Sequence, residues 1–200
     1  VLVDLNDAAA TLPNSYNSVE NITPLETPLS STINGAALAT PVFLSLYAEN
    51  DLRLDKYFAE TDEKGFRKNK KAGSNNYLCT FRVGEIYLTA AEAAARLGEL
   101  SQARTRLLEL MRKRYAPEAY EAKSVVVNAM DKEALVQEIL DERARELAFE
   151  GHRWFDLRRS TRPRLEKVLD GTRYVLEEND ARYTLAIPKE AIEANPGLLN

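Results

Sequence analysis

Cysteine and histidine are nearly absent from the sequence, which contains only Cys79 and His152 in 200 residues. A single cysteine cannot form a disulfide within the chain, and these two side chains are too few to complete a zinc site. The sequence also lacks any run of 18 apolar residues, the length typical of a membrane-spanning helix. We therefore expect no metal site, no cofactor and no membrane span.

An excess of positive charge is also lacking. The chain has 27 Lys and Arg against 31 Asp and Glu, so its net charge is −4 and its pI is about 5.3. Proteins that bind nucleic acid usually carry a basic surface, so this balance argues against such a partner. The hydrophobic fraction of 44% and the charged fraction of 29% are typical of globular proteins. We expect one domain spanning residues 1–200.

The sequence begins at Val1, without a methionine and without a basic, apolar signal segment. We expect a mature form or a fragment, from which localisation signals have been removed. Residues 1–40 are rich in Asn, Ser, Thr and Pro, which predicts a loop-rich segment. Residues 41–200 are predicted to form a helical region.

The helical region begins with residues 41–58, which have helical spacing that Asn50 and Asp51 could interrupt. Residues 59–76 are predicted to be a charged loop, with the basic run 67–71 in solvent. A helix is predicted for residues 82–97, ended by Gly98 in a left-handed conformation. Its predicted inner stripe is Ile86, Ala90, Ala93, Ala94 and Leu97. A second helix is predicted from Ser101, with an inner face of Ala103, Leu107, Leu108 and Leu110.

This predicted helical hairpin resembles a tetratricopeptide repeat. The small residues Ala91 and Ala103 would let two helix backbones approach closely, and Gly98 supplies the turn between them. A peptide-binding solenoid needs about three or more such units, and we find one. The pattern therefore favours a hairpin used for packing over a peptide-binding surface.

Further along the chain, Pro117 is predicted to mark the end of the hairpin region. Residues 124–128 (SVVVN) predict a strand or a buried linker, because three valines follow one another. Asp131 is a good N-cap for a long helix that reaches Phe149 and is closed by Gly151. Residues 152–159 predict a short helix, 182–188 the end of a strand, and 188–192 a helix with proline in its first turn. The predicted fold is mainly α.

A ladder of three carboxylates is the most conspicuous charged pattern. Glu142, Glu146 and Glu150 recur every four residues, which places them on one helix face. Such a row could act in acid–base catalysis or bind a metal, but nearby arginines and the lack of a partner nucleophile favour an ion-pair network. We therefore predict no catalytic residues and no enzyme. The predicted structural network is Glu142, Arg143, Glu146, Glu150, Arg153, Trp154 and Asp156.

Several segments, taken in order, resemble the C-terminal region of the SusD/RagB family over roughly residues 45–200. They are NDLR at 50–53, FRVGEIYLTAAEA at 81–93, Glu142 and Arg143 leading into ELAFEGHRWFDLRR at 146–159, LAIP at 185–188, and Asn195 with Pro196. Each segment is modest alone, whereas their combination and order are specific.

This resemblance implies a mainly α, SusD-like fold in which the tetratricopeptide-like hairpin packs with a long helix and irregular loops. Members of the family are lipoproteins on the cell-surface side of the outer membrane of Bacteroidota. They lie on a TonB-dependent transporter and capture oligosaccharides or other nutrients for import. The resemblance therefore implies a glycan-binding component of an uptake system, held at the membrane by a lipid anchor outside this chain. The alternative is a tetratricopeptide-type scaffold that binds a protein partner and no sugar.

Candidate sugar contacts lie in the polar loops, where an aromatic ring has amide neighbours. Sugar C–H faces stack on aromatic rings, and hydroxyl groups pair with amide donors and acceptors. Asn14, Tyr16 and Asn17 form the best such group, and Tyr77 lies in a second one, preceded by Asn75 and Asn76. The alternative is that these are ordinary turn residues.

Overall fold

The computed structural model describes residues 1–25, 38–71, 79–169, 171–195 and 197. The chain divides into two compact units, Val1–Arg153 and Trp154–Asn200. The single domain expected for residues 1–200 stays a prediction. In the described residues, no helix is long and apolar enough to cross a membrane.

The first unit begins with a succession of turns that leads into β1 (Asn21–Leu25), which pairs antiparallel with β5 (Cys79–Arg82). A three-stranded sheet has the order β2-β4-β3, formed by Leu38–Ala39, Arg67–Asn69 and Phe58–Thr61. The prediction of a loop over residues 59–76 is therefore wrong for the part of it that forms β3 and β4. Asp62 stabilises the turn between these strands, because its carboxylate accepts hydrogen bonds from the amides of Lys64 and Phe66.

Two short helices occupy the predicted helical segment 41–58, namely α2 (Pro41–Leu44) and α3 (Arg53–Tyr57). The predicted interruption lies between them. Asn50 adopts a left-handed conformation with φ of 64°, and the Asp51 carboxylate accepts a hydrogen bond from the amide of Arg53 at 3.0 Å. The left-handed turn at Asn50 and the side-chain hydrogen bond of Asp51 thus lie directly before the start of α3.

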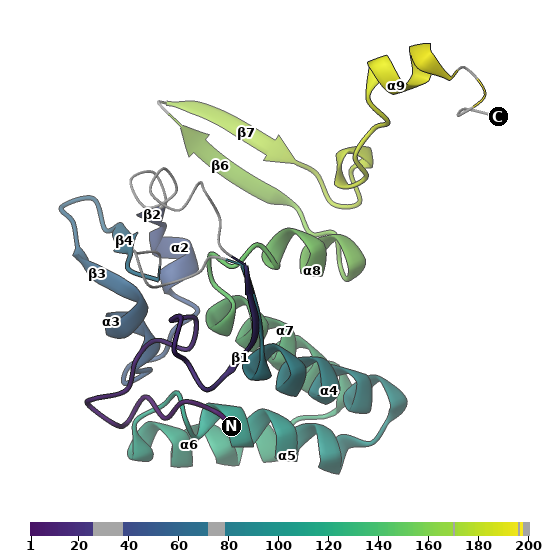
Figure 1. The fold of residues 1–200 in the computed structure, drawn as a ribbon. Coiled ribbons are helices and arrows are strands. Elements are labelled where there is room, and N and C mark those ends of the chain that lie inside the picture. Colours follow the sequence, from purple (N-terminus) through teal and green to yellow (C-terminus); the bar gives the residue numbers. More distant parts are fainter. Residues whose placement is uncertain (26–37, 72–78, 170, 196, 198–200) are drawn as a thin grey trace. The chain divides into compact units, whose positions relative to one another are not determined.

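Four longer helices follow one another in the first unit (Figure 1): α4 (Val83–Leu97), α5 (Leu100–Met111), α6 (Pro117–Ala129) and α7 (Lys132–Glu146). Gly98 ends α4 with φ of 86°, and Asp131 caps α7 by accepting from the amide of Ala134 at 2.9 Å. The mainly α fold with a hairpin of α4 and α5 is confirmed. Ala91 and Ala103 are both fully buried in its core.

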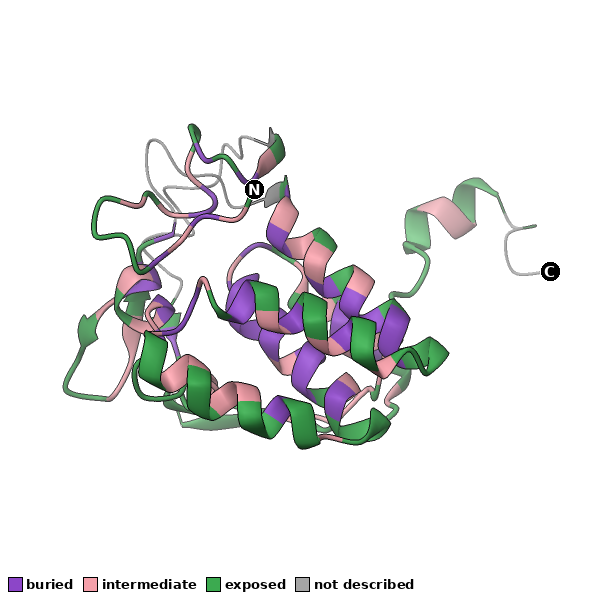
Figure 2. Cartoon of the chain, turned by 90° about the horizontal axis from the view of Figure 1, so that it is seen from below, coloured by how far each residue is buried: buried purple, intermediate pink, exposed green. Residues whose placement is uncertain are grey.

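The buried face of α4 differs from the predicted stripe. Leu88, Ala91 and Ala95 are fully buried, whereas Ile86 and Leu97 are 42% and 77% exposed. Helix α4 lies against both α5 and α7, so its buried face is set by two neighbours rather than by one apolar stripe. Figure 2 shows buried positions concentrated among these helices and exposed positions on their outer sides.

Helix α6 contradicts one prediction, because residues 124–128 lie within this helix rather than in a strand or linker. Pro117, expected to mark the end of the hairpin region, is the first residue of α6, and α5 ends before it at Met111. Proline fits the first helical turn because its missing N–H has no partner there in any case. Val127 is fully buried, whereas Val125 and Val126 face solvent. The burial of Val127 in the helical core therefore outweighs the preference of three consecutive valines for a strand.

Helix α7 ends at Glu146, three residues before the predicted end at Phe149. Phe149 and Gly151 both have positive φ, 62° and 86°, and the chain turns there. Glu150 therefore lies in the turn that follows α7, not on the helix.

The second unit contains α8 (Arg153–Arg159, whose first residue closes the first unit), the hairpin of β6 (Leu165–Leu169) and β7 (Thr172–Leu176), the 3-10 helix η1 (Ala181–Tyr183) and α9 (Lys189–Ala194). The strand end predicted at 182–188 is wrong, because Asp180 caps η1 at this point by accepting from the amide of Arg182. The helix predicted at 188–192 corresponds to α9. The ring of Trp154 stacks on that of Tyr183, with centroids 5.2 Å apart.

Candidate functional site

The glutamate ladder lies inside the first unit, within a cluster of buried charges that we call the ionic cluster. Its acidic members are Glu20, Asp51, Glu138, Glu142, Glu146 and Glu150, and its basic members are Arg53, Lys71, Arg82, Arg114 and Arg145. All of these residues are buried. Burial of so many charges requires that each has a partner, since an unpaired buried charge is very costly.

Glu146 is the centre of the ionic cluster. Arg82 donates to its Oε1 at 2.6 Å, and Arg114 and Arg53 donate to its Oε2 at 2.9 and 3.0 Å. Burial by itself would raise the pKa of Glu146. The charges of the three arginines outweigh that effect and hold the pKa well below its usual value. Glu146 is therefore ionised at neutral pH.

Glu150 and Lys71 form a second pair within the cluster. Arg82 Nε donates to Glu150 at 3.0 Å, and the Lys71 ammonium pairs with the same carboxylate. Lys71 also donates to the carbonyl oxygens of Glu146 and Ala148. Burial would raise the pKa of Glu150, but Arg82 and Lys71 lower it to about 2. Burial lowers the pKa of Lys71 to about 8, a shift that Glu150 opposes. The prediction that Lys71 belongs to a solvated basic run is wrong.

The ionic cluster also attaches the N-terminal segment to the helices. Glu20 accepts hydrogen bonds from the amide of Val3 at 2.8 Å and from Arg82 at 3.1 Å, and Arg114 donates to the carbonyl oxygen of Val3. Gly84 lies directly against these groups, and a Cβ there would be 2.6 Å from Nη1 of Arg82. Arg82 could move away only by giving up buried ion pairs, so the close approach requires a residue without a side chain.

The remaining members of the predicted network make other contacts. Arg143 donates to Thr89 on α4 at 3.1 Å, and Arg153 is exposed at the start of α8. Trp154 stacks on Tyr183, and Asp156 pairs with Arg159 at 2.6 Å, both within the second unit. The structure thus brings the three glutamates together, but mostly with arginines from distant segments.

Arg53, Lys71, Arg114 and Glu20 were not predicted, because they lie far from the glutamate ladder in sequence. One signal was present. The segment at 50–53 contains Asp51 and Arg53, and the segment at 81–93 contains Arg82 and Gly84. Segments identified for their resemblance to one family therefore converge on one cluster.

The chemistry available to the ladder is limited by its partners. A general acid must hold a proton near neutral pH, and a general base must reach a substrate. The carboxylate oxygens of Glu142 and Glu146 are occupied by guanidinium groups and are fully buried. In the described part of the chain, no group of three or more His, Cys, Asp or Glu side chains could hold a metal ion.

The predicted sugar contacts are only partly on the surface. Asn14 is fully buried, and its side chain donates to the carbonyl oxygen of Lys71 at 2.7 Å. This side chain therefore links two buried segments and is not exposed on the surface. Tyr16 is 60% exposed, and Asn17 is exposed beside it. Tyr77 lies outside the described residues.

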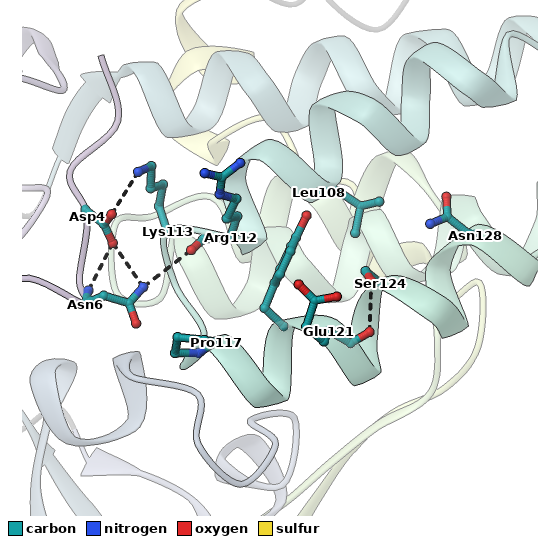
Figure 3. A pocket seen from close by; sticks show the side chains of 10 residues that line it. Asp4, Asn6, Leu108, Arg112, Lys113, Pro117, Glu121, Ser124 and Asn128 are labelled. Atoms are coloured by element: carbon teal, nitrogen blue, oxygen red, sulfur yellow. Dashed lines mark hydrogen bonds and ion pairs between the residues drawn. The ribbon is translucent and has the colours of Figure 1, made fainter.

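A surface hollow of about 680 Å³ lies between the N-terminal segment, the end of α5 and one side of α6 (Figure 3). At the end formed by the N-terminal segment, Lys113 donates to Asp4 at 2.8 Å and Asn6 donates to Asp4 at 3.0 Å. Arg112, Glu121 and Asn128 line it further along. Its residues on α6 were not predicted, because residues 124–128 were expected to form a strand or a buried linker rather than part of a helix. Pro117 at a first helical position was the available signal.

Comparison with known proteins gives one family match and one structural match that bear on this chain. The model of the SusD family matches residues 37–200. Among solved structures, a SusD-like carbohydrate binding protein from Bacteroides vulgatus ATCC 8482 superposes with a TM-score of 0.61 at 19% identity. The match covers 96% of this chain and 52% of that one, so the chain spans about half of its length. Among curated proteins, none matches.

Proposed function

Because the chain belongs to the SusD family, we propose that it is the carbohydrate-binding component of a nutrient-uptake system at the outer membrane. The observation that carries this proposal is the match of the family over residues 37–200, which includes every helix of the described chain. The solved SusD-like protein of the same fold is described as carbohydrate binding, which supports the same ligand class.

The finer parts of the proposal follow from the family. The protein works with a TonB-dependent transporter, lies on the cell-surface side of the outer membrane of a member of the Bacteroidota, and is held there by a lipid anchor. Its ligand is an oligosaccharide or a related nutrient that the transporter then imports. Tyr16 and Asn17 are proposed ligand contacts on the exposed part of the N-terminal segment.

The protein binds its ligand without cleaving it. The support for this part is the state of Glu142, Glu146 and Glu150, which are buried and paired with arginines or lysine. Acid–base hydrolysis of a glycoside needs one carboxyl that keeps its proton and a second that reaches the sugar. The pKa of each of these three glutamates lies below its usual value, which is the opposite of what a general acid needs.

Isothermal titration calorimetry tests the proposal, with the 200-residue chain titrated by a panel of neutral and acidic oligosaccharides and by short peptides. We expect saturable heat with at least one oligosaccharide, no heat with the peptides, and no reducing ends released during the incubation. If folded protein binds a peptide and no oligosaccharide, the proposal is wrong and the scaffold alternative is favoured. Release of reducing ends that Glu146→Gln abolishes would contradict the non-catalytic part.

A further inference from the structure

The surface hollow beside α6 has the size of a ligand site. Its volume of about 680 Å³ lies within the roughly 300–1,000 Å³ that is common for small-molecule sites. Its walls come from segments far apart in sequence, with Asp4 and Asn6 at one side and α5 and α6 at the other. The hollow is therefore built by the tertiary fold, not by one loop.

The wall nearest the N-terminus is already internally bonded. Asp4 accepts from Lys113 at 2.8 Å and from both the backbone and side-chain nitrogens of Asn6. The side chain of Asn6 also donates to the carbonyl oxygen of Tyr115 at 3.2 Å. These bonds hold the wall in one geometry before any ligand arrives, which lowers the cost of ordering it upon binding.

The opposite side of the hollow presents side chains that are not engaged. Within the described residues, the side chains of Arg112, Tyr120, Glu121 and Asn128 make no hydrogen bond and no ion pair. Tyr120 is half-buried and contributes an aromatic ring, whereas the other three are exposed. One guanidinium, one carboxylate, one amide and one phenol thus line the same cavity with their polar atoms available (Figure 3).

This combination of groups suits a polyhydroxylated ligand. A sugar offers a C–H face for the ring of Tyr120 and neighbouring hydroxyl groups that both donate and accept. Arg112 donates only, an ionised Glu121 accepts only, and Asn128 does both, so each class of hydroxyl bond has a partner. Hydrogen bonds to charged groups are the stronger ones, which favours a contribution from Arg112 and Glu121.

The charge balance argues for a neutral sugar. Of the four charged residues that line the hollow, Asp4 and Lys113 neutralise each other, and Arg112 and Glu121 are of opposite sign. An acidic sugar would bring a further negative charge near Glu121 and Asp4, and a basic sugar would bring a further positive charge near Arg112 and Lys113. A neutral ligand meets neither repulsion.

We propose that this hollow is a binding subsite for a neutral oligosaccharide, in which Tyr120 stacks on one sugar ring while Arg112, Glu121 and Asn128 bond its hydroxyl groups. This inference rests on the proposed function and adds to it a location and a ligand class. The subsite is separate from the residues Tyr16 and Asn17 considered above, which do not line the hollow.

The test is calorimetry with neutral gluco-, manno- and xylo-oligosaccharides, an oligogalacturonate as the acidic probe, and glycylglycine as a zwitterionic probe. For the neutral sugar that binds, Arg112→Ala and Glu121→Gln should each weaken the affinity about tenfold. The first change removes a hydrogen bond from a charged group, and the second replaces a carboxylate by a neutral amide, which is a weaker acceptor. Both side chains are exposed, so the fold should be unaffected. Arg106→Ala on α5 and Glu118→Gln on α6 are matched controls, because both residues are exposed and lie outside the hollow.

The outcomes separate this inference from the function on which it rests. If a neutral sugar binds and neither Arg112→Ala nor Glu121→Gln weakens it, the site lies elsewhere and only the subsite is wrong. If the oligogalacturonate or glycylglycine binds in the hollow in preference to every neutral sugar, the ligand class is wrong. If no oligosaccharide binds to the folded protein, the subsite and the proposed function both fail.

Discussion

Ion pairs occur in both compact units, but their surroundings differ. In the first unit, Arg82 and Glu146 are 2.6 Å apart and both side chains are 0% exposed. In the second unit, Arg173 and Glu166 are also 2.6 Å apart, but their side chains are 61% and 34% exposed. The same distance therefore describes a contact sealed from water and a contact screened by it. Burial, more than distance, decides what each pair contributes to stability.

The buried pairs are costly to form and still more costly to break. Each charge in the ionic cluster has lost its hydration, and arginine–carboxylate contacts with several partners compensate for that loss. Removing one member leaves its neighbours buried without a counter-charge. An exposed pair has no such dependence, because water replaces the missing partner.

The largest effect is expected for Glu146→Ala, which removes the central carboxylate and leaves parts of Arg53, Arg82 and Arg114 unpaired. Loss of one partner of a buried pair costs about 3–5 kcal/mol, so the melting temperature should fall clearly. Lys64→Ala, at an exposed position in the turn between β3 and β4, is the control and should not change it. Differential scanning calorimetry measures both. Equal melting temperatures for the two variants would show that the cluster does not hold the fold together.

A smaller effect is expected from acid, through Glu150. Burial alone would raise the pKa of Glu150. The charges and hydrogen bonds of Arg82 and Lys71 outweigh burial and lower this pKa from 4.5 to about 2 in the folded chain. A carboxyl with a depressed folded pKa stabilises the fold above the unfolded pKa and loses that contribution as the pH falls through the folded one. We therefore expect about 3 kcal/mol of stability to be lost between pH 4.5 and pH 2.

Urea unfolding at a series of pH values measures this loss. Glu150→Gln cannot titrate, so its stability should be lower at pH 7 and should change less across the same window. If the wild type and Glu150→Gln lose stability in parallel between pH 4.5 and pH 2, another group is responsible and Glu150 is not the acid-sensitive member.

The comparison also explains what the sequence could predict. Local signals were sufficient for Gly98 as a helix end, for Asp131 as a helix cap and for the small residues Ala91 and Ala103 in the hairpin. Each depends on backbone conformation or on neighbours a few positions away. The row of glutamates was likewise visible as a period of four.

The partners of those glutamates could not be predicted in the same way. Glu146 bonds with Arg53, Arg82 and Arg114, which are 93, 64 and 32 positions away. Such contacts follow from tertiary packing, which no local pattern specifies. Glu150 also joins the cluster from a turn rather than from the helix on which its spacing placed it. The hollow was not predicted for a related reason, because one of its walls is α6. The run of valines in α6 favours a strand, but tertiary packing buries Val127 and the segment is a helix.

The smallest effect is expected for Glu166→Ala in the second unit, where the change removes the ion pairs that Glu166 makes with Arg164 and Arg173. The cross-strand pairing of β6 and β7 remains, with Val168 opposite Arg173 and Glu166 opposite Val175. Hydrogen bonds from arginine lower the pKa of Glu166, but water and salt screen all of these exposed charges. Amide hydrogen exchange of the hairpin, followed by NMR, should therefore be the same in the variant and the wild type. Arg173→Ala, which removes the other partner of the cross-strand pair, should give the same result.

The opposite outcome would be faster amide exchange in both variants, together with equally fast exchange in the wild type in 1 M salt. It would mean that an exposed ion pair supports this hairpin. Burial would then not be what distinguishes the two units.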